Sequence, residues 1–173
     1  MSIKAIVFDC GGVLLRDGDQ SDAYRRWEQR LGLVEGALPQ HLWAGEAWER
    51  AQVGQITEQE YWQQVGAGLG VTDPDIIDTL SRELWDSWSL DDRVLALIDR
   101  ARERHVVAML SNATTALEEM LSGRYGVADR FATIVNSARV GVAKPDPAIY
   151  HELLRRLGAQ PRDVVFIDDR AEN

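Results

Sequence analysis

The sequence has little cysteine and no long apolar run. Its only cysteine is Cys10, so an intrachain disulfide bond and a zinc site built from several cysteines are both excluded. No stretch approaches the ~18 apolar residues that a membrane-spanning helix needs. Residues 1–9 reach an acidic residue too soon for a signal peptide. We therefore expect a cytoplasmic protein that does not bind a membrane.

Basic residues are also scarce. Lysine and arginine number 19 against 28 aspartates and glutamates, which gives a net charge of −9. Such an acidic surface repels phosphate backbones and argues against nucleic-acid binding, although a metal ion can still hold one small phosphorylated molecule. Gly11 and Gly12 do not form a nucleotide-binding P-loop, because no Gly-Lys-Ser/Thr follows them.

Four short apolar runs predict a buried parallel sheet. They cover residues 3–8, 106–110, 131–135 and 164–167, and polar residues follow each run. Helical patterns lie between them, at 94–101, 117–121 and 147–157. Strands that alternate with helices build βαβ units and a doubly wound, Rossmann-like α/β fold. Ligands of such sheets bind at the carboxyl ends of the strands, so the polar residues should meet at one edge.

Residues 16–88 contain no convincing strand and read as helical. Thr57 and Glu60 have capping-box spacing, and Asp73-Pro74 opens a helix whose apolar spacing continues to Trp88. All six tryptophans lie here, and we interpret them as the core of a helical insertion or as a dimer contact rather than as the lining of a substrate pocket. The sequence therefore predicts a helical insertion over residues 16–88, with the α/β core formed by residues 1–15 and 89–173.

Carboxylates follow two of the predicted strands. Asp9 precedes two glycines, so it lies on a loop whose backbone can approach a ligand closely. An aspartate can attack phosphorus as a nucleophile, while the simpler alternative is that Asp9 caps a turn. Asp168 and Asp169 follow the last strand. Three crowded carboxylates need a cation, and oxygen ligands favour Mg²⁺; a solvated acidic turn is the alternative.

Two further polar sites complete this edge. Ser111 and Asn112 stand between a strand and a helix, where a hydroxyl and backbone amides suit an anion or simply cap the helix. Lys144 lies on a loop with two prolines and can neutralise a phosphoryl oxygen or orient a nucleophile, unless it is merely solvated. Together the four places supply a nucleophile, an anion binder, a lysine and a metal site, which is what phosphoryl transfer requires.

Four segments resemble the motifs of the haloacid dehalogenase-like hydrolase superfamily, in chain order and across the whole chain. They are residues 8–14 (FDCGGVL), 110–112 (LSN), 144–147 (KPDP) and 166–173 (FIDDRAEN). The resemblance implies that Asp9 is the nucleophile, and that Lys144 stabilises a phosphoryl group held by Ser111 and Asn112. It also implies Mg²⁺ as cofactor, with the ligands Asp9, the Gly11 carbonyl and Asp168, and with Asp169 supporting the site. The helical insertion of residues 16–88 resembles the α-helical cap of that superfamily.

One position departs from the resemblance. Phosphatases of this superfamily usually carry a second aspartate, the general acid and base, where this chain has Gly11. General acid–base catalysis contributes roughly 10²–10⁴-fold. The leaving group can be a good one, as in an anomeric sugar phosphate. Alternatively Asp17, an ordered water or a cap residue supplies the proton. In the third interpretation the protein is a catalytically weak binding or regulatory relative.

The sequence therefore predicts a Mg²⁺-dependent hydrolase of phosphoric monoesters. It would act on a small phosphorylated metabolite, with sugar phosphates among the candidates, through an aspartyl-phosphate. A 2-haloacid dehalogenase is the alternative, but the dehalogenases of this superfamily usually lack a pair like Asp168 and Asp169. Similar proteins continue past the position of Asn173 with a helix and usually a strand, so we expect the chain to be short at its C-terminus.

Overall fold

The computed structural model describes residues 2–17 and 20–173, apart from the side chains of Asp17, Gln20 and Ser21. The chain divides into two compact units. One comprises residues 1–16, 52–54 and 90–173, and the other comprises residues 17–51 and 55–89. We call the first the core unit and the second the cap unit. Residues 52–54, which the sequence assigns to the cap, group with the core unit.

The core unit contains a four-stranded parallel sheet in the order β5-β4-β1-β6. The strands are β1 (Ala5–Phe8), β4 (Val106–Ser111), β5 (Thr133–Asn136) and β6 (Val164–Ile167). All four predicted strands are therefore confirmed. The chain runs outward from β1 to β5 and then returns to place β6 on the other side of β1. Such a reversal creates a crevice at the carboxyl ends of the strands, where α/β proteins bind ligands.

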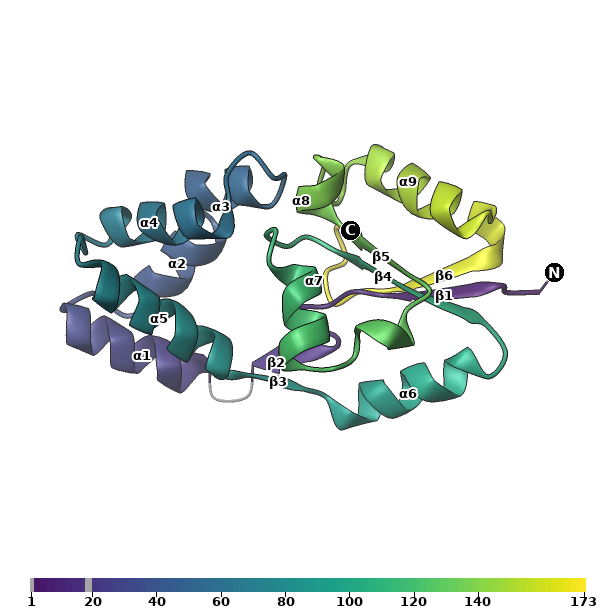
Figure 1. The fold of residues 1–173 in the computed structure, drawn as a ribbon, viewed down its shortest axis with the longest axis horizontal. Helices are drawn as coiled ribbons and strands as arrows, with labels where there is room; N and C mark the ends of the chain where they lie inside the picture. Colours follow the sequence, from purple (N-terminus) through teal and green to yellow (C-terminus); the bar gives the residue numbers. More distant parts are fainter. Residues whose placement is uncertain (1, 18–19) are drawn as a thin grey trace. The chain divides into compact units, whose positions relative to one another are not determined.

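Helices cover both faces of this sheet, and Figure 1 shows α9 on one side of it and α6 on the other. The core-unit helices are α6 (Asp92–Arg102), α7 (Leu117–Glu119), α8 (Ser137–Val140) and α9 (Pro147–Leu157), with a π-helical turn at Met120–Arg124 and 3₁₀ turns at Ala128–Arg130 and Pro161–Asp163. Aspartates cap the starts of two of these helices. Asp91 accepts backbone hydrogen bonds at the start of α6, and Asp146 does so at the start of α9, with Pro147 in the first turn.

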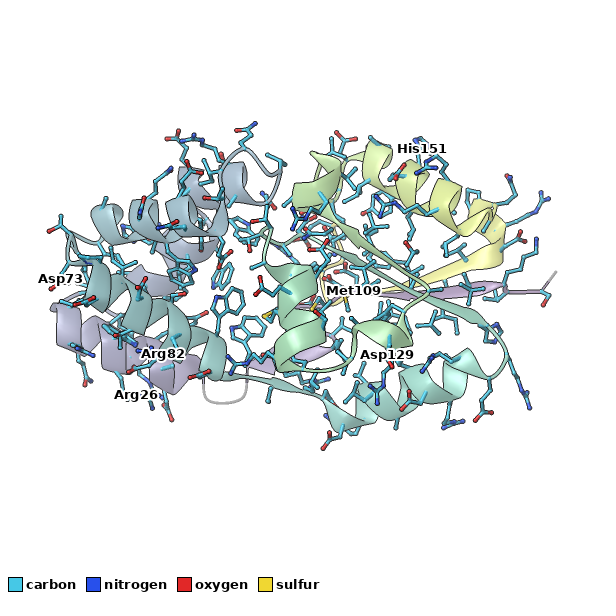
Figure 2. The ribbon with its side chains drawn as sticks, viewed as in Figure 1. Arg26, Asp73, Arg82, Met109, Asp129 and His151 are labelled. Atoms are coloured by element: carbon cyan, nitrogen blue, oxygen red, sulfur yellow. The ribbon has the colours of Figure 1, made fainter. Side chains whose placement is uncertain are left out.

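Apolar contacts between sheet and helices hold the core unit together. Ile149 and Leu153 of α9 pack against Val7, Leu110 and Val135 of the sheet, and all five are buried. Fully burying an aliphatic side chain contributes about 1.5–3 kcal/mol. Met109 of β4 is also fully buried, and Figure 2 shows it inside the unit while the exposed His151 points outward. The sheet edge is thereby a rigid support for the loops that follow each strand.

The cap unit is helical. Its helices are α1 (Gln20–Leu31), α2 (Ala37–Trp43), α3 (Glu46–Ala51), α4 (Glu58–Gly68) and α5 (Pro74–Asp86). The predicted capping box is confirmed, because the Thr57 hydroxyl accepts from the Glu60 amide and the Glu60 carboxylate accepts from the Thr57 amide. Within the described part of the chain, no helix has the length and apolar character to cross a membrane.

Five of the six tryptophans pack in the core of the cap unit. Trp27 and Trp62 are buried there, and Trp43, Trp48 and Trp85 pack partly buried against the same cluster. Edge-to-face contacts connect several of them, such as Trp43 and Trp48, whose ring centroids are 5.0 Å apart. Aromatic pairs of this kind add about 0.5–1.5 kcal/mol beyond their buried area. These tryptophans therefore stabilise the cap, as the sequence indicates.

The prediction that Trp88 continues a helix is wrong. Helix α5 ends at Asp86, and Trp88 begins the short strand β3 (Trp88–Leu90). This strand pairs with β2 (Leu15–Asp17). The two strands overlap the ends of the segment that was expected to lack strands. Helical spacing reaches Trp88 in the sequence, but pairing with a distant segment determines its conformation, and periodicity does not reveal such a partner.

Candidate active site

Asp9 directly follows β1, at the centre of the sheet edge. Its backbone amide donates to the Ile167 carbonyl over 2.9 Å, which aligns it with the end of β6. Its side chain is buried, and its Oδ1 accepts from the Cys10 amide over 2.7 Å. The chain then turns back on itself, since the Leu15 amide donates to the Cys10 carbonyl over 2.8 Å. This tight loop fixes the Asp9 carboxylate at the carboxyl end of β1.

Gly12 lets this loop approach the end of β6. Its φ is +75°, a left-handed conformation in which a side chain is strained, and an added Cβ would lie 2.3 Å from Asp169 Oδ2. Only glycine fits there without displacing the carboxylate. Gly11, whose carbonyl is a predicted metal ligand, forms a parallel bridge with Leu15 in the same loop. The close approach at Gly12 thus places Asp169 beside the Asp9 loop.

Lys144 joins the carboxylates of two strand ends. It stands on the loop between α8 and α9, and its Nζ lies 2.9 Å from Asp9 Oδ2 and 2.6 Å from Asp168 Oδ2. Only 1% of the Lys144 side chain is exposed. The ammonium group also lies 5.2 Å from the centre of the Phe166 ring, a distance that permits a cation–π interaction. The lysine is therefore a buried cation with two carboxylate partners.

The environment shifts the pKa values of these two aspartates in opposite directions. Burial raises the pKa of Asp9, and the nearby Lys144 ammonium offsets only part of this effect. Burial also acts on Asp168, but hydrogen bonds from Lys144, the Arg170 amide and the Asn173 side chain outweigh it and lower the pKa of Asp168. Asp168 is therefore the more firmly ionised carboxylate of the pair.

The acidic residues fit a hard divalent cation. Asp9, Asp168 and Asp169 each offer a carboxylate oxygen, and these oxygens lie within 4.8 Å of one another. Mg²⁺ is bound by one or two carboxylates together with waters and substrate phosphates. Asp168 is also oriented from outside this cluster, because its Oδ1 accepts from the Arg170 amide over 2.8 Å. The Gly11 carbonyl remains a predicted ligand.

The two polar residues after β4 have different surroundings. Ser111 is the last residue of β4 and is buried. The Asn112 side chain is bonded to the backbone of Lys144: its Nδ2 donates to the Lys144 carbonyl over 3.0 Å, and its Oδ1 accepts from the Lys144 amide over 2.8 Å. The structure thus brings Asn112 to the loop of residues 141–146 that carries Lys144, which we call the lysine loop. Contacts of both residues with a phosphoryl group remain predictions.

Sequence reasoning missed the residues that hold the loop after β4. Asn136, at the end of β5, donates to the Thr114 carbonyl over 2.8 Å. The Ser137 hydroxyl accepts from the Ala113 amide over 3.0 Å. Both side chains are buried. The signal was visible, because Asn136 and Ser137 are the polar residues that follow the third apolar run, but the sequence did not show which loop they bind.

Comparison with family models assigns the chain to a family. A family model described as haloacid dehalogenase-like hydrolase matches residues 3–173. The chain belongs to the haloacid dehalogenase-like hydrolase family. The resemblance seen in its four motifs is therefore confirmed, and the parallel α/β sheet is the expected core of this hydrolase family.

Relatives of this hydrolase include a phosphatase. Sesquiterpene phosphatase astK of Aspergillus oryzae is 27% identical over 173 residues, which cover 99% of this chain and 83% of that protein. The chain spans less than half of several other curated relatives that it matches. It is thus similar to proteins that differ widely in length, and only part of each longer relative corresponds to this hydrolase.

Solved structures of the family share the fold. A family enzyme of Bacteroides thetaiotaomicron, solved with magnesium and inorganic phosphate, has a TM-score of 0.76 at 21% identity and covers 98% of this chain and 86% of its own. L-2-haloacid dehalogenase of Xanthobacter autotrophicus has a TM-score of 0.70 at 23% identity, with 95% and 69% covered. The same fold therefore occurs in a magnesium and phosphate complex and in a dehalogenase.

The position of the expected general acid has no acidic side chain in this hydrolase, because Gly11 occupies it. The Asp17 side chain, one predicted substitute, lies outside the described part of the chain.

Tyr150 is a titratable residue near the site that sequence reasoning missed. Its ring centroid lies 6.2 Å from that of Phe166, and burial raises the pKa of Tyr150, with Asp168 and Asp9 adding to the shift.

Proposed function

We propose that this hydrolase is a Mg²⁺-dependent phosphatase that cleaves the phosphoric monoester of a small metabolite. The observation that carries the proposal is the group of Asp9, Asp168 and Asp169 at the carboxyl ends of the strands, with the Lys144 ammonium bound to Asp9 and Asp168. A nucleophilic carboxylate, a fixed cation and oxygen ligands for a metal are the parts that phosphoryl transfer uses. The phosphatase among the relatives supports the same conclusion.

In the proposed reaction an Asp9 oxygen attacks phosphorus, and the bond between phosphorus and the ester oxygen breaks. The leaving alkoxide takes a proton from water. A second water then attacks the phosphorus of the aspartyl-phosphate, which releases inorganic phosphate and restores the carboxylate. Among the described residues, Cys10 donates to one Asp9 oxygen and Lys144 to the other, so each oxygen retains a lone pair for a metal or for attack.

The surrounding residues lower the barrier by holding charge in place. Lys144 keeps the Asp9 carboxylate oriented and stabilises the additional negative charge that develops on the phosphoryl oxygens. Ser111 binds the phosphoryl group, and the family resemblance implies the same role for Asn112. Bound to the three aspartates, Mg²⁺ would supply Lewis-acid stabilisation of the phosphoryl oxygens.

Gly11 favours substrates with a good leaving group, because no carboxylate stands there to protonate the departing oxygen. Anomeric sugar phosphates meet this condition. The name of the Aspergillus relative adds a second class, sesquiterpene phosphates. Both classes belong in the substrate panel, and their relative kcat/KM values measure which leaving group the enzyme prefers.

The deciding experiment compares wild type with Asp9→Asn on a panel of phosphate esters, with Mg²⁺ and with a chelator. We expect phosphate release by the wild type only with Mg²⁺, and none above background by the variant. Asp163→Asn is the matched control, because Asp163 is also a buried aspartate of the core unit but pairs with Lys4. An unchanged rate in Asp9→Asn would overturn the mechanism.

Gly11 also favours a second candidate, a binding or regulatory protein that keeps the site but turns over poorly. In that case the wild type binds Mg²⁺ but releases phosphate no faster than Asp9→Asn. Halide release from a 2-haloacid without Mg²⁺ would instead identify a dehalogenase. The same purified proteins therefore separate all three functions.

A further inference from the structure

Asn112 and Lys144 are connected by a pair of hydrogen bonds that neither motif predicts alone. The Asn112 amide donates to the Lys144 carbonyl over 3.0 Å, and the Lys144 amide donates to the Asn112 carbonyl oxygen over 2.8 Å. One planar side chain thus binds both backbone groups of one residue. Two bonds to the same residue fix the orientation of its backbone as well as its position.

This pair holds the middle of the lysine loop. The loop begins at Gly141, which ends α8, and it ends at Asp146, which caps α9. Between these ends, Asn112 connects the loop to the last residue of β4, in the interior of the sheet. The loop after β4 is itself anchored to β5 and α8 by Asn136 and Ser137. The sheet therefore supports Lys144 through Asn112.

The orientation of Lys144 is important because its ammonium has little freedom. It lies between Asp9 and Asp168 at 2.9 and 2.6 Å, and its side chain is almost entirely buried. A backbone shift of about 1 Å would carry Nζ away from one or both carboxylates. Displacements of that size at a reacting centre can cost about 10²-fold in rate.

We propose that Asn112 is a positioning residue, which acts on the reaction through Lys144 rather than by holding the phosphoryl group. The proposal rests on the phosphatase function proposed above. It departs from the role that the family resemblance implies for Asn112. It also makes a distinct prediction: once the Lys144 ammonium has been removed, Asn112 has nothing left to position.

A double-mutant cycle tests this prediction. Asn112→Ala is made in the wild type and in Lys144→Ala, and kcat is measured on the best phosphate ester with Mg²⁺. We expect a loss of about 10²-fold in the wild-type background. In Lys144→Ala the same change should alter kcat by less than about twofold, the limit within which independent effects are resolved. A loss of equal size in both backgrounds would mean that Asn112 contacts the substrate, and would overturn the proposal.

Unfolding provides a readout that needs no turnover. Asn112 bonds to the backbone of Lys144, which Lys144→Ala retains, so Asn112→Ala should lower the urea midpoint equally in both backgrounds. An unchanged midpoint would show that the two bonds do not hold the loop, which also overturns the proposal. Asp163→Asn is the control: it breaks the ion pair with Lys4 and leaves the bonds between Asn112 and the Lys144 backbone intact, so any cost in kcat should be the same in both backgrounds.

The two proposals fail in different ways. If the wild type hydrolyses no ester, the phosphatase function fails, and the cycle is repeated on the affinity for inorganic phosphate with Mg²⁺, measured by calorimetry, beside the unfolding readout. If hydrolysis is present but the Asn112→Ala loss persists in Lys144→Ala, only the positioning role fails. Should Asn112→Ala not fold, Asn112→Asp keeps the acceptor for the Lys144 amide and serves in the same cycle.

Discussion

The Lys144 ammonium lies 2.6 Å from Asp168 Oδ2, closer than the 2.9 Å that separates it from Asp9 Oδ2. The lysine is therefore shared between the proposed nucleophile and a proposed metal ligand. Its positive charge compensates for the burial of both carboxylates. The same group thus contributes to stability and to the proposed chemistry.

Removal of this charge should destabilise the fold strongly. Lys144→Met keeps most of the side-chain volume but leaves two buried carboxylates without their cation, and breaking a buried ion pair costs about 3–5 kcal/mol. The free energy of unfolding, measured with urea near neutral pH, should fall by that amount. Added Mg²⁺ should restore part of the loss, because a ligand of the folded state stabilises it.

Lys4→Met is the control for this change. Lys4 also pairs with an aspartate, Asp163, at 2.8 Å, but 66% of its side chain is exposed. Exposed ion pairs contribute about 0–1 kcal/mol, so the control should lose far less. Equal losses in the two variants would contradict the view that burial of the Lys144 pair sets its cost.

The sequence predicted the site edge because parallel strands leave few alternatives. Once Asp9 and Asp168 follow neighbouring parallel strands, the register that pairs Phe8 with Ile167 must place them side by side. Ser111 reaches the same edge because it ends β4, the other neighbour of β1. The composition of three strand ends therefore contained most of the geometry of the acidic site.

Contacts between loops were not predictable in this way. The pairing of Asn112 with Lys144 joins residues 32 positions apart, and no periodicity of either segment encodes it. The prediction that Trp88 continues a helix was wrong for a related reason, because pairing of β3 with the distant strand β2 determines the conformation of Trp88. Local patterns predict elements, and sheet topology predicts which ends meet, but side-chain bonds between loops depend on the packed structure.

Gly12→Ala should disturb the metal site more than the fold. A left-handed backbone costs a non-glycine residue about 1–2 kcal/mol, and the new Cβ would also lie 2.3 Å from Asp169 Oδ2. We expect Mg²⁺ affinity to fall by about 10–100-fold, the usual cost of disturbing groups that orient metal ligands. Calorimetric titration with Mg²⁺ measures the affinity, and urea unfolding measures the stability.

Gly158→Ala separates backbone strain from displacement of the carboxylate. Gly158 ends α9 with a φ of +59°, and an added Cβ there would have nothing within 4 Å. This control should lose a similar free energy of unfolding but keep the wild-type Mg²⁺ affinity. If both variants bound Mg²⁺ as the wild type does, Asp169 would have no part in the metal site.

Asp91 should give part of the stability a pH dependence. It caps α6, and its hydrogen bonds with the Arg93 side chain are the main reason why the pKa of Asp91 falls to about 2. The usual value, 3.8, applies to the unfolded chain. Because the folded pKa is the lower one, the ionised carboxylate stabilises the fold above about pH 4, and this contribution is lost as the pH falls towards about 2.

Asp91→Asn isolates this contribution, because asparagine still caps a helix but carries no charge. Urea unfolding of both proteins should give a difference in free energy that is constant from about pH 7 to about pH 5 and shrinks between about pH 4 and pH 2. A difference that stays constant down to the lowest pH would mean that the charge of Asp91 has no role in stability.

Tyr150→Phe should not destabilise the protein and should raise its free energy of unfolding by about 1 kcal/mol. The Tyr150 hydroxyl is buried without a hydrogen-bond partner among the described residues, and an unpaired buried polar group costs about 1–3 kcal/mol. Phenylalanine keeps the ring against Phe166 and removes that cost.

Tyr61→Phe is the matched control, since the buried Tyr61 hydroxyl donates to the Leu42 carbonyl over 2.8 Å. Loss of this hydrogen bond in Tyr61→Phe should lower the free energy of unfolding by about 0.5–1.5 kcal/mol. The two substitutions remove the same atom, so opposite signs in urea unfolding would isolate the effect of the partner, and a loss of equal size in Tyr150→Phe would show that its hydroxyl is bonded in the folded protein.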